Sequence, residues 1–403
     1  MDIKGARQLF QELITKEDPG LLIRYWDGST QRLGGDELAA TVHIKKPDVI
    51  DEIVKEPSLG FGEAYMRGDI DIDGDLGAIL SIAYRRDLFS RLSLGKKTRF
   101  CWLKFSGKHS ISHCKRDVQR HYDKGNEFYR LWLDKEMNYS CAYFEREDQD
   151  LETAQKNKNL HILKKLRLKP GHRLLDIGCG WGALIRIAAT KFGVEAVGLT
   201  LSREQKALGD KRILDEGLGD RCEIRLQDYR EVPRREQGTY DRLVSVGMFE
   251  HVGREKYKVF FRRAYELLKE NGLFLLHTIS RLKPQDTDPW ICTYIFPGGY
   301  IPSIGQVLEA AHDAGFRLVD IEDLRRHYAL TLMAWLKRFE AAKGKISEMM
   351  GEEFIRMWRL YLVGSRVSFS VGGMYVSQFL FEKGDTGEIP LTRAWMHCDS
   401  TSP

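Results

Sequence analysis

Short hydrophobic runs alternate with helical patterns over most of the chain after about residue 155. Runs of aliphatic residues predict strands at 173–177, 195–199, 223–226, 241–246 and 272–279. Amphipathic patterns predict helices at 202–216, 255–269, 330–342 and 352–363, and a last strand is predicted at 374–381. Asn271 and Gly272 are a typical stop for the second of these helices. This alternation is typical of a parallel sheet with helices on both faces.

The first 85 residues follow a different pattern. An opening amphipathic helix is predicted from Leu9, Phe10 and Leu13, which share one helical face. Short alternating stretches at 21–26 and 41–44 predict strands. The segment is therefore predicted to form a small α+β domain that precedes the larger α/β domain.

A basic segment follows this first domain. Residues 88–116 contain no Asp or Glu, but lysines and arginines are interleaved there with aromatic and aliphatic residues. Such a segment suits an anionic bilayer surface, and a solvated linker is an equally good interpretation. His109, His113 and Cys114 have the spacing of metal ligands on a helix but lack a fourth ligand, so no metal site is predicted. The predicted ranges are 1–85 and 121–390 for the domains, 86–120 for the linker and 391–403 for a C-terminal tail.

Composition narrows the class of protein. With 403 residues, of which 42% are hydrophobic, the chain can bury two cores and is too apolar to be disordered. A net charge of +5 is too small to indicate a nucleic-acid partner. The charged N-terminus and the lack of an apolar run of about 20 residues predict neither a signal peptide nor a membrane span, so we expect a cytoplasmic location. Scattered cysteines without a C-x-x-C pair indicate neither disulfides nor zinc.

Three alternate glycines, Gly178, Gly180 and Gly182, come directly after the first predicted strand of the larger domain. Glycines at such a turn allow the backbone to approach a ligand closely. A nicotinamide dinucleotide is the obvious competitor, but its fingerprint is G-x-G-x-x-G, whereas this turn is G-x-G-x-G. Asp176 would repel a pyrophosphate and would attract the cationic amino acid part of S-adenosylmethionine. The turn therefore predicts S-adenosylmethionine, and a turn without any ligand is the alternative.

Polar residues also follow the next two strands. Thr200 and Gln205 could bond the ribose, where many nucleotide folds carry a carboxylate, and Ser202 could be only the N-cap of its helix. Asp228 and Tyr229 could line an adenine slot. Each of these could equally be an ordinary residue at the end of a strand.

Several longer motifs occur in a fixed order along the chain. They comprise His-Tyr-Asp-Lys-Gly-Asn-Glu-Phe-Tyr at 121–129, Met-Asn-Tyr-Ser-Cys-Ala-Tyr-Phe at 137–144, the glycine turn with Trp181, and the segments 198–205, 245–253, 277–279, 289–297 and 328–335. With these motifs the sequence resembles the cyclopropane-fatty-acyl-phospholipid synthases over nearly its full length, and the related mycolic acid cyclopropane synthases over the catalytic part. The segment 61–66, Phe-Gly-Glu-Ala-Tyr-Met, resembles the N-terminal domain of full-length bacterial members.

The resemblance implies a fold, a cofactor and partners. The fold would be a Rossmann-like class I methyltransferase with a mixed seven-stranded sheet, preceded by a small α+β lipid-binding domain. The enzyme would be a homodimer, peripherally associated with the inner face of the membrane, and would act on phospholipids with unsaturated acyl chains. S-adenosylmethionine would be the co-substrate. Its implied site consists of Tyr139, Ser140, Asp176, Gly178, Cys179, Gly180, Trp181, Gly182, Thr200, Leu201, Gln205, Asp228 and Tyr229.

The resemblance also implies a bicarbonate ion in the active site. By motif match the ion would be held by Cys141, Glu250, His277, Ile279 through its backbone, and Tyr328, with Cys141, Glu250, His277 and Tyr328 as the catalytic residues. His251, next to Glu250, is an alternative to His277. Cys141 would act by position rather than as a thiolate nucleophile, because methylation of an alkene has no acyl step.

Three other functions remain open at the level of the sequence. The same fold and cofactor could give methyl-branched or hydroxylated acyl chains, or the chain could be an amine N-methyltransferase. It could also be a membrane-binding module without catalytic activity. One departure from the family is the entry to the last strand, Val371-Gly372-Gly373, where the family often has basic residues, so the family role of this strand is left open.

Overall fold

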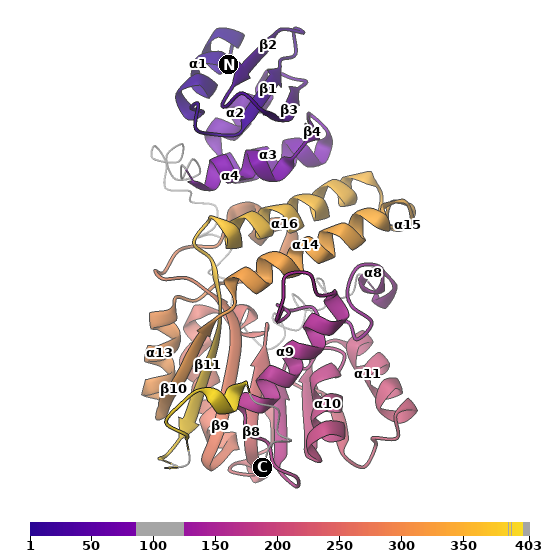
Figure 1. Ribbon diagram of the computed structural model, residues 1–403, viewed down its shortest axis with the longest axis vertical. Coiled ribbons are helices and arrows are strands. Elements are labelled where there is room, and N and C mark those ends of the chain that lie inside the picture. Colours follow the sequence, from indigo (N-terminus) through magenta and orange to yellow (C-terminus); the bar gives the residue numbers. More distant parts are fainter. Residues whose placement is uncertain (86–124, 386, 388, 398–403) are drawn as a thin grey trace. The chain divides into compact units, whose positions relative to one another are not determined.

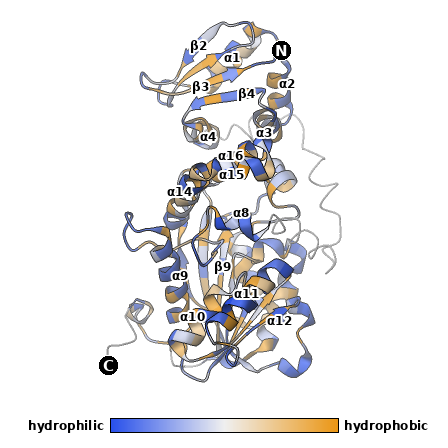
Figure 2. Cartoon of the chain, turned by 90° about the vertical axis from the view of Figure 1, so that its right-hand side faces the viewer, coloured by the Kyte–Doolittle hydropathy of each residue, from blue (hydrophilic) through white to orange (hydrophobic). Residues whose placement is uncertain are grey.

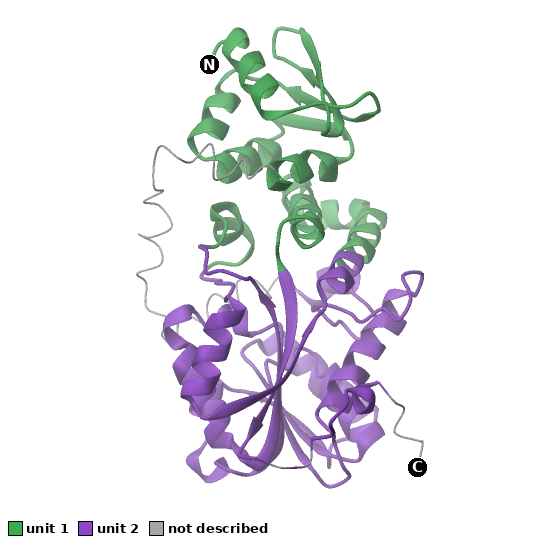
Figure 3. Cartoon of the chain, turned by 60° about the vertical axis from the view of Figure 1, so that its left-hand side comes forward, with its two compact units in different colours: residues 1–107, 287–297, 332–374 green, residues 108–286, 298–331, 375–403 purple. Residues whose placement is uncertain are grey.

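The computed structural model describes residues 1–85, 125–385, 387 and 389–397. The chain forms two compact units, shown in different colours in Figure 3. Unit 1 comprises Met1–Gly107, Thr287–Pro297 and Leu332–Met374, and unit 2 comprises Lys108–Asp286, Gly298–Thr331 and Tyr375–Pro403. Two segments from within the predicted 121–390 domain thus belong to unit 1. The predicted linker 86–120, which includes His109, His113 and Cys114, lies outside the described residues.

Unit 1 contains a four-stranded sheet with the order β2-β1-β3-β4. Its strands are β1 (Gly20–Arg24), β2 (Thr30–Leu33), β3 (Leu38–Ile44) and β4 (Ile70–Gly74), and its first helices are α1 (Ile3–Leu13), α2 (Asp48–Lys55), α3 (Pro57–Arg67) and α4 (Leu76–Arg85). The opening helix and the α+β pattern agree with the sequence prediction. Ala6 of α1 packs with Ile23, Val42 and Ile50 in one buried cluster.

The later segments of unit 1 are mainly helical. They comprise the part of α14 (Arg325–Ala341) from Leu332 onward, α15 (Lys343–Met350), α16 (Glu352–Ser370) and the π-helical turn Ile291–Ile295. Helix α16 contacts α3 and α4, and its Arg356 donates hydrogen bonds to the carbonyl oxygens of Tyr65 and Ile70. A Cβ on Gly62 would lie 2.2 Å from the Trp290 ring, so only glycine fits at this position.

Unit 2 is built on a seven-stranded sheet with the order β10-β11-β9-β8-β5-β6-β7 (Figure 1). The strands are β5 (Arg173–Ile177), β6 (Glu195–Thr200), β7 (Cys222–Leu226), β8 (Tyr240–Val246), β9 (Leu268–Ser280), β10 (Phe316–Asp323) and β11 (Tyr375–Lys383). Strands β5 to β9 pair in parallel, whereas β11 is antiparallel to β9 and β10. The predicted mixed seven-stranded sheet is confirmed.

Helices cover both faces of this sheet. Successive side chains of a strand point to opposite faces, and those of β5 and β6 are nearly all buried. The α-helices in the described part of unit 2 are α8 (Asn126–Arg130), α9 (Leu151–Lys165), α10 (Ala183–Phe192), α11 (Arg203–Asp215), α12 (Tyr257–Leu267), α13 (Ile304–Asp313) and the first residues of α14. Leu174 packs in one cluster with residues of α9, α10 and α11, and Leu175 packs in another with residues of α12 and α13. Figure 2 shows many hydrophilic residues on α11 and α12.

The structure corrects one boundary and adds elements that the hydrophobic pattern does not predict. The helix predicted at 255–269 ends at Leu267, because β9 already begins at Leu268, before the expected stop at Asn271 and Gly272. Strand β10 and helix α13 are additional. Met396, in the predicted tail, packs into the core of unit 2. Among the described residues, no helix has both the length and the apolarity needed to cross a bilayer.

Candidate active site

The glycine turn connects the end of β5 to the start of α10. Gly178, Gly180 and Gly182 have φ angles of 96°, 55° and 80°, which is the left-handed region that glycine tolerates best. The N–H groups of Gly178 and Cys179 donate to the carbonyl oxygen of Leu199 at 3.0 and 2.9 Å. The turn is thereby fixed against the end of β6.

A pocket opens at this turn, at the carboxyl ends of β5, β6 and β8 and beside the segment after β7. In doubly wound sheets this edge is the usual place for a ligand. Twelve of the thirteen predicted cofactor residues line the pocket, namely Tyr139, Ser140, Asp176, Gly178, Cys179, Gly180, Trp181, Thr200, Leu201, Gln205, Asp228 and Tyr229. Gly182 does not line it. Its role is local, since a Cβ there would lie 2.8 Å from Ile224.

Asp176 is a buried carboxylate on the wall of this pocket. Its side chain is 2% exposed, and within the described part of the chain its Oδ1 has no hydrogen-bond partner. Burial raises the pKa of Asp176 to about 7, against the opposing charge of Lys158. A buried carboxylate without a donor is costly, so this oxygen suits a cationic ligand group.

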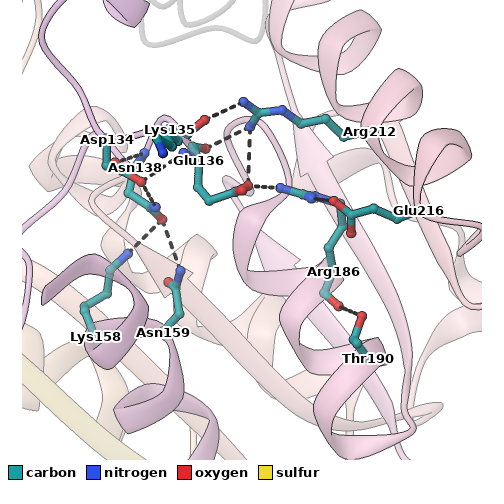
Figure 4. Close-up of polar contacts among 10 residues, drawn as sticks. All are labelled: Asp134, Lys135, Glu136, Asn138, Lys158, Asn159, Arg186, Thr190, Arg212 and Glu216. Carbon is teal, nitrogen blue, oxygen red and sulfur yellow. Dashed lines mark hydrogen bonds and ion pairs between the residues drawn. The ribbon is translucent and has the colours of Figure 1, made fainter. Parts of the chain in front are cut away.

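Lys158 of α9 lies on the wall of the same pocket and is 2% exposed. Its Nζ donates to Asn138 Oδ1 at 3.3 Å and to Ser140 Oγ at 3.1 Å. Figure 4 shows Lys158 and Asn159 both directed at the side chain of Asn138, which Asp134 holds from the other side. Burial lowers the pKa of Lys158 to about 8. The pocket therefore contains a buried cation as well as a buried carboxylate, and sequence reasoning missed the cation.

The loop that carries Asn138 is anchored by ion pairs on its other side (Figure 4). Glu136 pairs with Arg186 of α10 and lies 3.7 Å from Arg212 of α11, and Arg212 also donates to the carbonyl oxygens of Lys135 and Glu136. Arg186 pairs in turn with Glu216. These contacts fix the start of the segment that continues to Tyr139 and Ser140.

The predicted ribose residues bond to each other. The Thr200 hydroxyl donates to Gln205 Oε1 at 2.7 Å, which leaves the amide NH2 of Gln205 as the donor for a ligand. The Ser202 side chain accepts the N–H of Gln205 and is the N-cap of α11. This is the second of the two roles that the sequence left open for Ser202. Asp228 is held by Arg230 through both of its carboxylate oxygens.

Trp181 belongs to an aromatic cluster beside the pocket. Its indole N–H donates to Asn126 Oδ1 at 2.7 Å, and its ring lies 5.5 Å from that of Tyr129. Tyr129 in turn contacts Tyr139, with ring centroids 5.6 Å apart. The cluster holds two of the predicted cofactor residues in place.

A second group of residues adjoins the pocket. Cys141 follows Ser140, and its Sγ lies 3.7 Å from the carbonyl oxygen of Leu324. The Leu324 N–H donates to Val376 of β11, and Val376 is paired with Ile279 of β9. The predicted anion-binding residues come from neighbouring strands of the sheet and from the segments that adjoin them: His277 and Ile279 on β9, Glu250 just after β8, Cys141 in its loop and Tyr328 in the first turn of α14.

Glu250 is the central acid of this second group. Its Oε1 accepts the backbone N–H of Ile279 at 2.7 Å, so this N–H holds the carboxylate of Glu250. The other oxygen, Oε2, is buried and has no hydrogen-bond partner among the described residues. Burial raises the pKa of Glu250, which favours a group that can hold or release a proton.

His277 and Cys141 are both held in their neutral forms. Burial, together with the charges of Lys158 and Lys165, lowers the pKa of His277 to about 3. Burial also raises the pKa of the Cys141 thiol far above its ordinary value. A thiolate is the reactive form of cysteine, so the structure agrees with a positional role for Cys141 rather than a nucleophilic one.

His251, the alternative to His277, lies elsewhere. It lines the cofactor pocket, and burial lowers its pKa to about 4. His277 does not line that pocket, but its strand lies next to β8, and Gly247 donates to its carbonyl oxygen at 2.9 Å. The two histidines thus occupy different places: His251 lines the cofactor pocket, and His277 lies outside that lining.

The pocket at the glycine turn of the doubly wound sheet thus contains both a buried carboxylate and a buried ammonium group. Together, the sheet, the turn and this pocket define a class I S-adenosylmethionine-dependent methyltransferase. Within that class, the chain belongs to the mycolic acid cyclopropane synthetase family, whose model matches residues 109–379. A domain of unknown function matches residues 7–91.

Full-length relatives share most of the chain. It is 39% identical over 357 residues to a cyclopropane-fatty-acyl-phospholipid synthase of Escherichia coli, which covers 88% of this chain and 91% of the relative. It is 35% identical over 389 residues to a probable fatty acid methyltransferase of Pseudomonas putida, and this match covers 94% of this chain and 96% of the relative. Among solved structures, the cyclopropane synthase MmaA2 from Mycobacterium tuberculosis is 39% identical, with a TM-score of 0.64 over 67% of this chain and 98% of that one.

Proposed function

We propose that the protein is a cyclopropane-fatty-acyl-phospholipid synthase, which transfers a methylene group from S-adenosylmethionine to the cis double bond of an unsaturated phospholipid acyl chain. The observation that carries this proposal is the second, buried group around Glu250 beside the cofactor pocket. An ordinary methyl transfer ends when the methyl group has moved. Ring closure needs in addition a site that removes a proton from that methyl group, and Glu250 with His277 supplies it.

S-adenosylmethionine fits the pocket by charge. In the described part of the chain Asp176 Oδ1 has no donor, and the methionyl ammonium would provide one. Lys158 contacts only the neutral oxygens of Asn138 and Ser140 among the described residues, and the methionyl carboxylate would give it an ionic partner. When bound, S-adenosylmethionine supplies an electrophilic methyl group. The residues of the pocket hold the methyl group in line with the alkene and exclude water, which an alkene needs because it is a weak nucleophile.

Bicarbonate fits the second group by its hydrogen-bonding demands. The buried Oε2 of Glu250, with its raised pKa, can donate or accept a proton, and the neutral His277 can donate from one ring nitrogen. When bound, bicarbonate supplies the base for removal of the proton from the transferred methyl group. Glu250 and His277 orient it and lead the proton away, Tyr328 donates a hydrogen bond to it, and Cys141 contributes its position.

We also propose that the enzyme works as a homodimer in the cytoplasm, bound peripherally to the inner face of the membrane, with no nucleic-acid partner. The basic and aromatic residues of 88–116 support binding to anionic phospholipids. The family membership supports the choice of an acyl-chain substrate.

The test is mass spectrometry of acyl chains after the purified protein has been incubated with S-adenosylmethionine and vesicles of cis-monounsaturated phospholipid. We expect a gain of one CH2 with loss of the double bond, and fragmentation that locates a three-membered ring. A methyl-branched product would instead establish a methyl-branching fatty acyl methyltransferase, which the likeness to the Pseudomonas putida relative favours as the second candidate. Unchanged lipid despite binding of the cofactor would contradict both and favour an amine N-methyltransferase.

Lys158→Met is expected to weaken binding of S-adenosylhomocysteine about 10- to 100-fold, because it removes the cation that faces the methionyl carboxylate. Isothermal titration at pH 7.5 measures the effect. Binding of 5′-methylthioadenosine, which lacks the amino acid part, should change little in the same variant. Equal weakening of both ligands would show that Lys158 supports the pocket wall rather than the carboxylate.

A further inference from the structure

A buried chain of polar side chains, which the proposed mechanism does not use, lies behind His277. His277 of β9 is paired in the sheet with Gln378 of β11, and the two side chains are 2% and 0% exposed. The Nε2 of Gln378 lies 3.2 Å from Nδ1 of His277. On its other side, Gln378 Oε1 accepts from Nζ of Lys165 at 3.0 Å.

Lys165 is held in place by carboxylates from β10. It is 1% exposed, it pairs with Glu322 and it lies 4.0 Å from Asp320. Glu322 also bonds His161 at 2.6 Å. Although burial raises the pKa of Glu322, the hydrogen bond from His161 and the charge of Lys165 lower it to about 2. The ammonium group therefore faces charged partners and stays fixed behind Gln378.

The direction of each hydrogen bond follows from this arrangement. A lysine ammonium only donates, so the atom of Gln378 that faces Lys165 must be the amide oxygen. The amide NH2 must then face His277, and Nδ1 must be the acceptor. A neutral imidazole with Nδ1 as acceptor carries its proton on Nε2. The amide and the ring are thus oriented by Lys165 rather than by any ligand.

We propose that Lys165 and Gln378 are positioning residues that fix His277 as the Nε2–H tautomer, so that its free ring edge presents an N–H donor to an anionic ligand. This proposal rests on the proposed function for the identity of the anion, but the tautomer itself does not depend on it. Without the pair, the ring could present a bare nitrogen to the anion, which would repel it.

Gln378→Glu tests the proposal most sharply. The variant keeps the shape of the side chain and its contact with Lys165, now as an ion pair, but places an acceptor against Nδ1. We expect His277 to change to the Nδ1–H tautomer, and lipid turnover to fall at least about 100-fold, with binding of S-adenosylhomocysteine unchanged. The tautomer is read from the imidazole ¹⁵N shifts of the full chain labelled at histidine, with His277→Gln for assignment.

Two further variants keep the test decisive. Gln378→Met removes both the donor and the acceptor, and should give mixed tautomers even if the glutamate variant folds poorly. Lys165→Met should give mixed tautomers as well, whereas Lys156→Met, at an exposed lysine on the same helix, should change nothing. An Nδ1–H tautomer in the unmodified protein, or a tautomer change without loss of turnover, overturns the proposal. If the unmodified protein shows the Nε2–H tautomer but forms no cyclopropane lipid, the proposed function fails while the positioning of His277 stands.

Discussion

Replacing Glu250 with Gln is expected to lower the turnover of phospholipid by on the order of 100- to 1000-fold while leaving binding of S-adenosylhomocysteine nearly unchanged. Glutamine keeps an oxygen that can accept the N–H of Ile279, which now donates to Oε1 at 2.7 Å. It lacks the carboxylate itself, whose pKa is raised by burial. The Oε2 of that carboxylate is buried and has no hydrogen-bond partner in the residues that the structure describes. The chemical step should therefore suffer, and the cofactor pocket should not.

The measurement is lipid turnover at saturating S-adenosylmethionine, together with calorimetric binding of S-adenosylhomocysteine. Glu255→Gln is the matched control, since this carboxylate is exposed and lies only five residues further along the chain. It should retain full turnover. Near-normal turnover in the Glu250 variant would remove Glu250 from the mechanism, and a parallel loss of cofactor binding would make its role structural.

The parts of the fold that sequence reasoning predicted are those that are buried on both faces of the sheet. Residues Leu273–Leu276 of strand β9 are a continuous apolar run in which every residue is buried, and such a run has few other interpretations. Strand β10 was not predicted, because it lies at the edge of the sheet and has a mixed burial pattern with Arg317, Asp320 and Glu322 interspersed. Its hydrophobic pattern is too weak to distinguish it from a loop.

The residues of the candidate site also divide into those that the sequence predicted and those that it did not. The glycine turn and the residues at the ends of strands are local signals, and all of the predicted cofactor residues except Gly182 line one pocket. Lys158 and Lys165 are both on α9, whose sequence contains many polar residues, and such helices are usually solvated. Yet Gln155, Lys158, His161 and Lys165 are buried. Their spacing of three or four residues places them on one face of the helix, and that periodicity is the signal that could have indicated a buried polar face.

Gln378 could not have been found from local sequence. It lies within the last strand, whose family role was left open because the basic residues that often enter it are missing. Only the antiparallel pairing of β11 with β9 brings Gln378 opposite His277, and those residues are separated by 101 positions. Pairing between strands so distant in the chain is set by tertiary structure rather than by the pattern of either segment.

Asp176→Asn is expected to have two opposite effects, a loss of cofactor affinity and a gain in stability of the ligand-free protein. The substitution removes the charge that faces the methionyl ammonium, so binding of S-adenosylhomocysteine should weaken about 100-fold at pH 8. Binding of 5′-methylthioadenosine should change little. Titration of both ligands into both proteins decides this part, and equal weakening of the two ligands would contradict the assignment of Asp176 to the amino acid part.

The gain in stability follows from the raised pKa. Burial raises the pKa of Asp176 from 3.8 to about 7 in the folded chain, so between these two values the folded state keeps a proton that the unfolded state loses. The free energy of unfolding therefore falls as pH rises through this window, by up to about 4 kcal/mol at pH 8 and about half of that at pH 5.5. Asparagine removes this penalty. Denaturant unfolding without ligand should show the variant to be more stable than the unmodified protein, with the larger difference at pH 8. A difference that does not depend on pH would mean that Asp176 is not the origin of the penalty, and the affinity of the pocket for the cofactor would need another source.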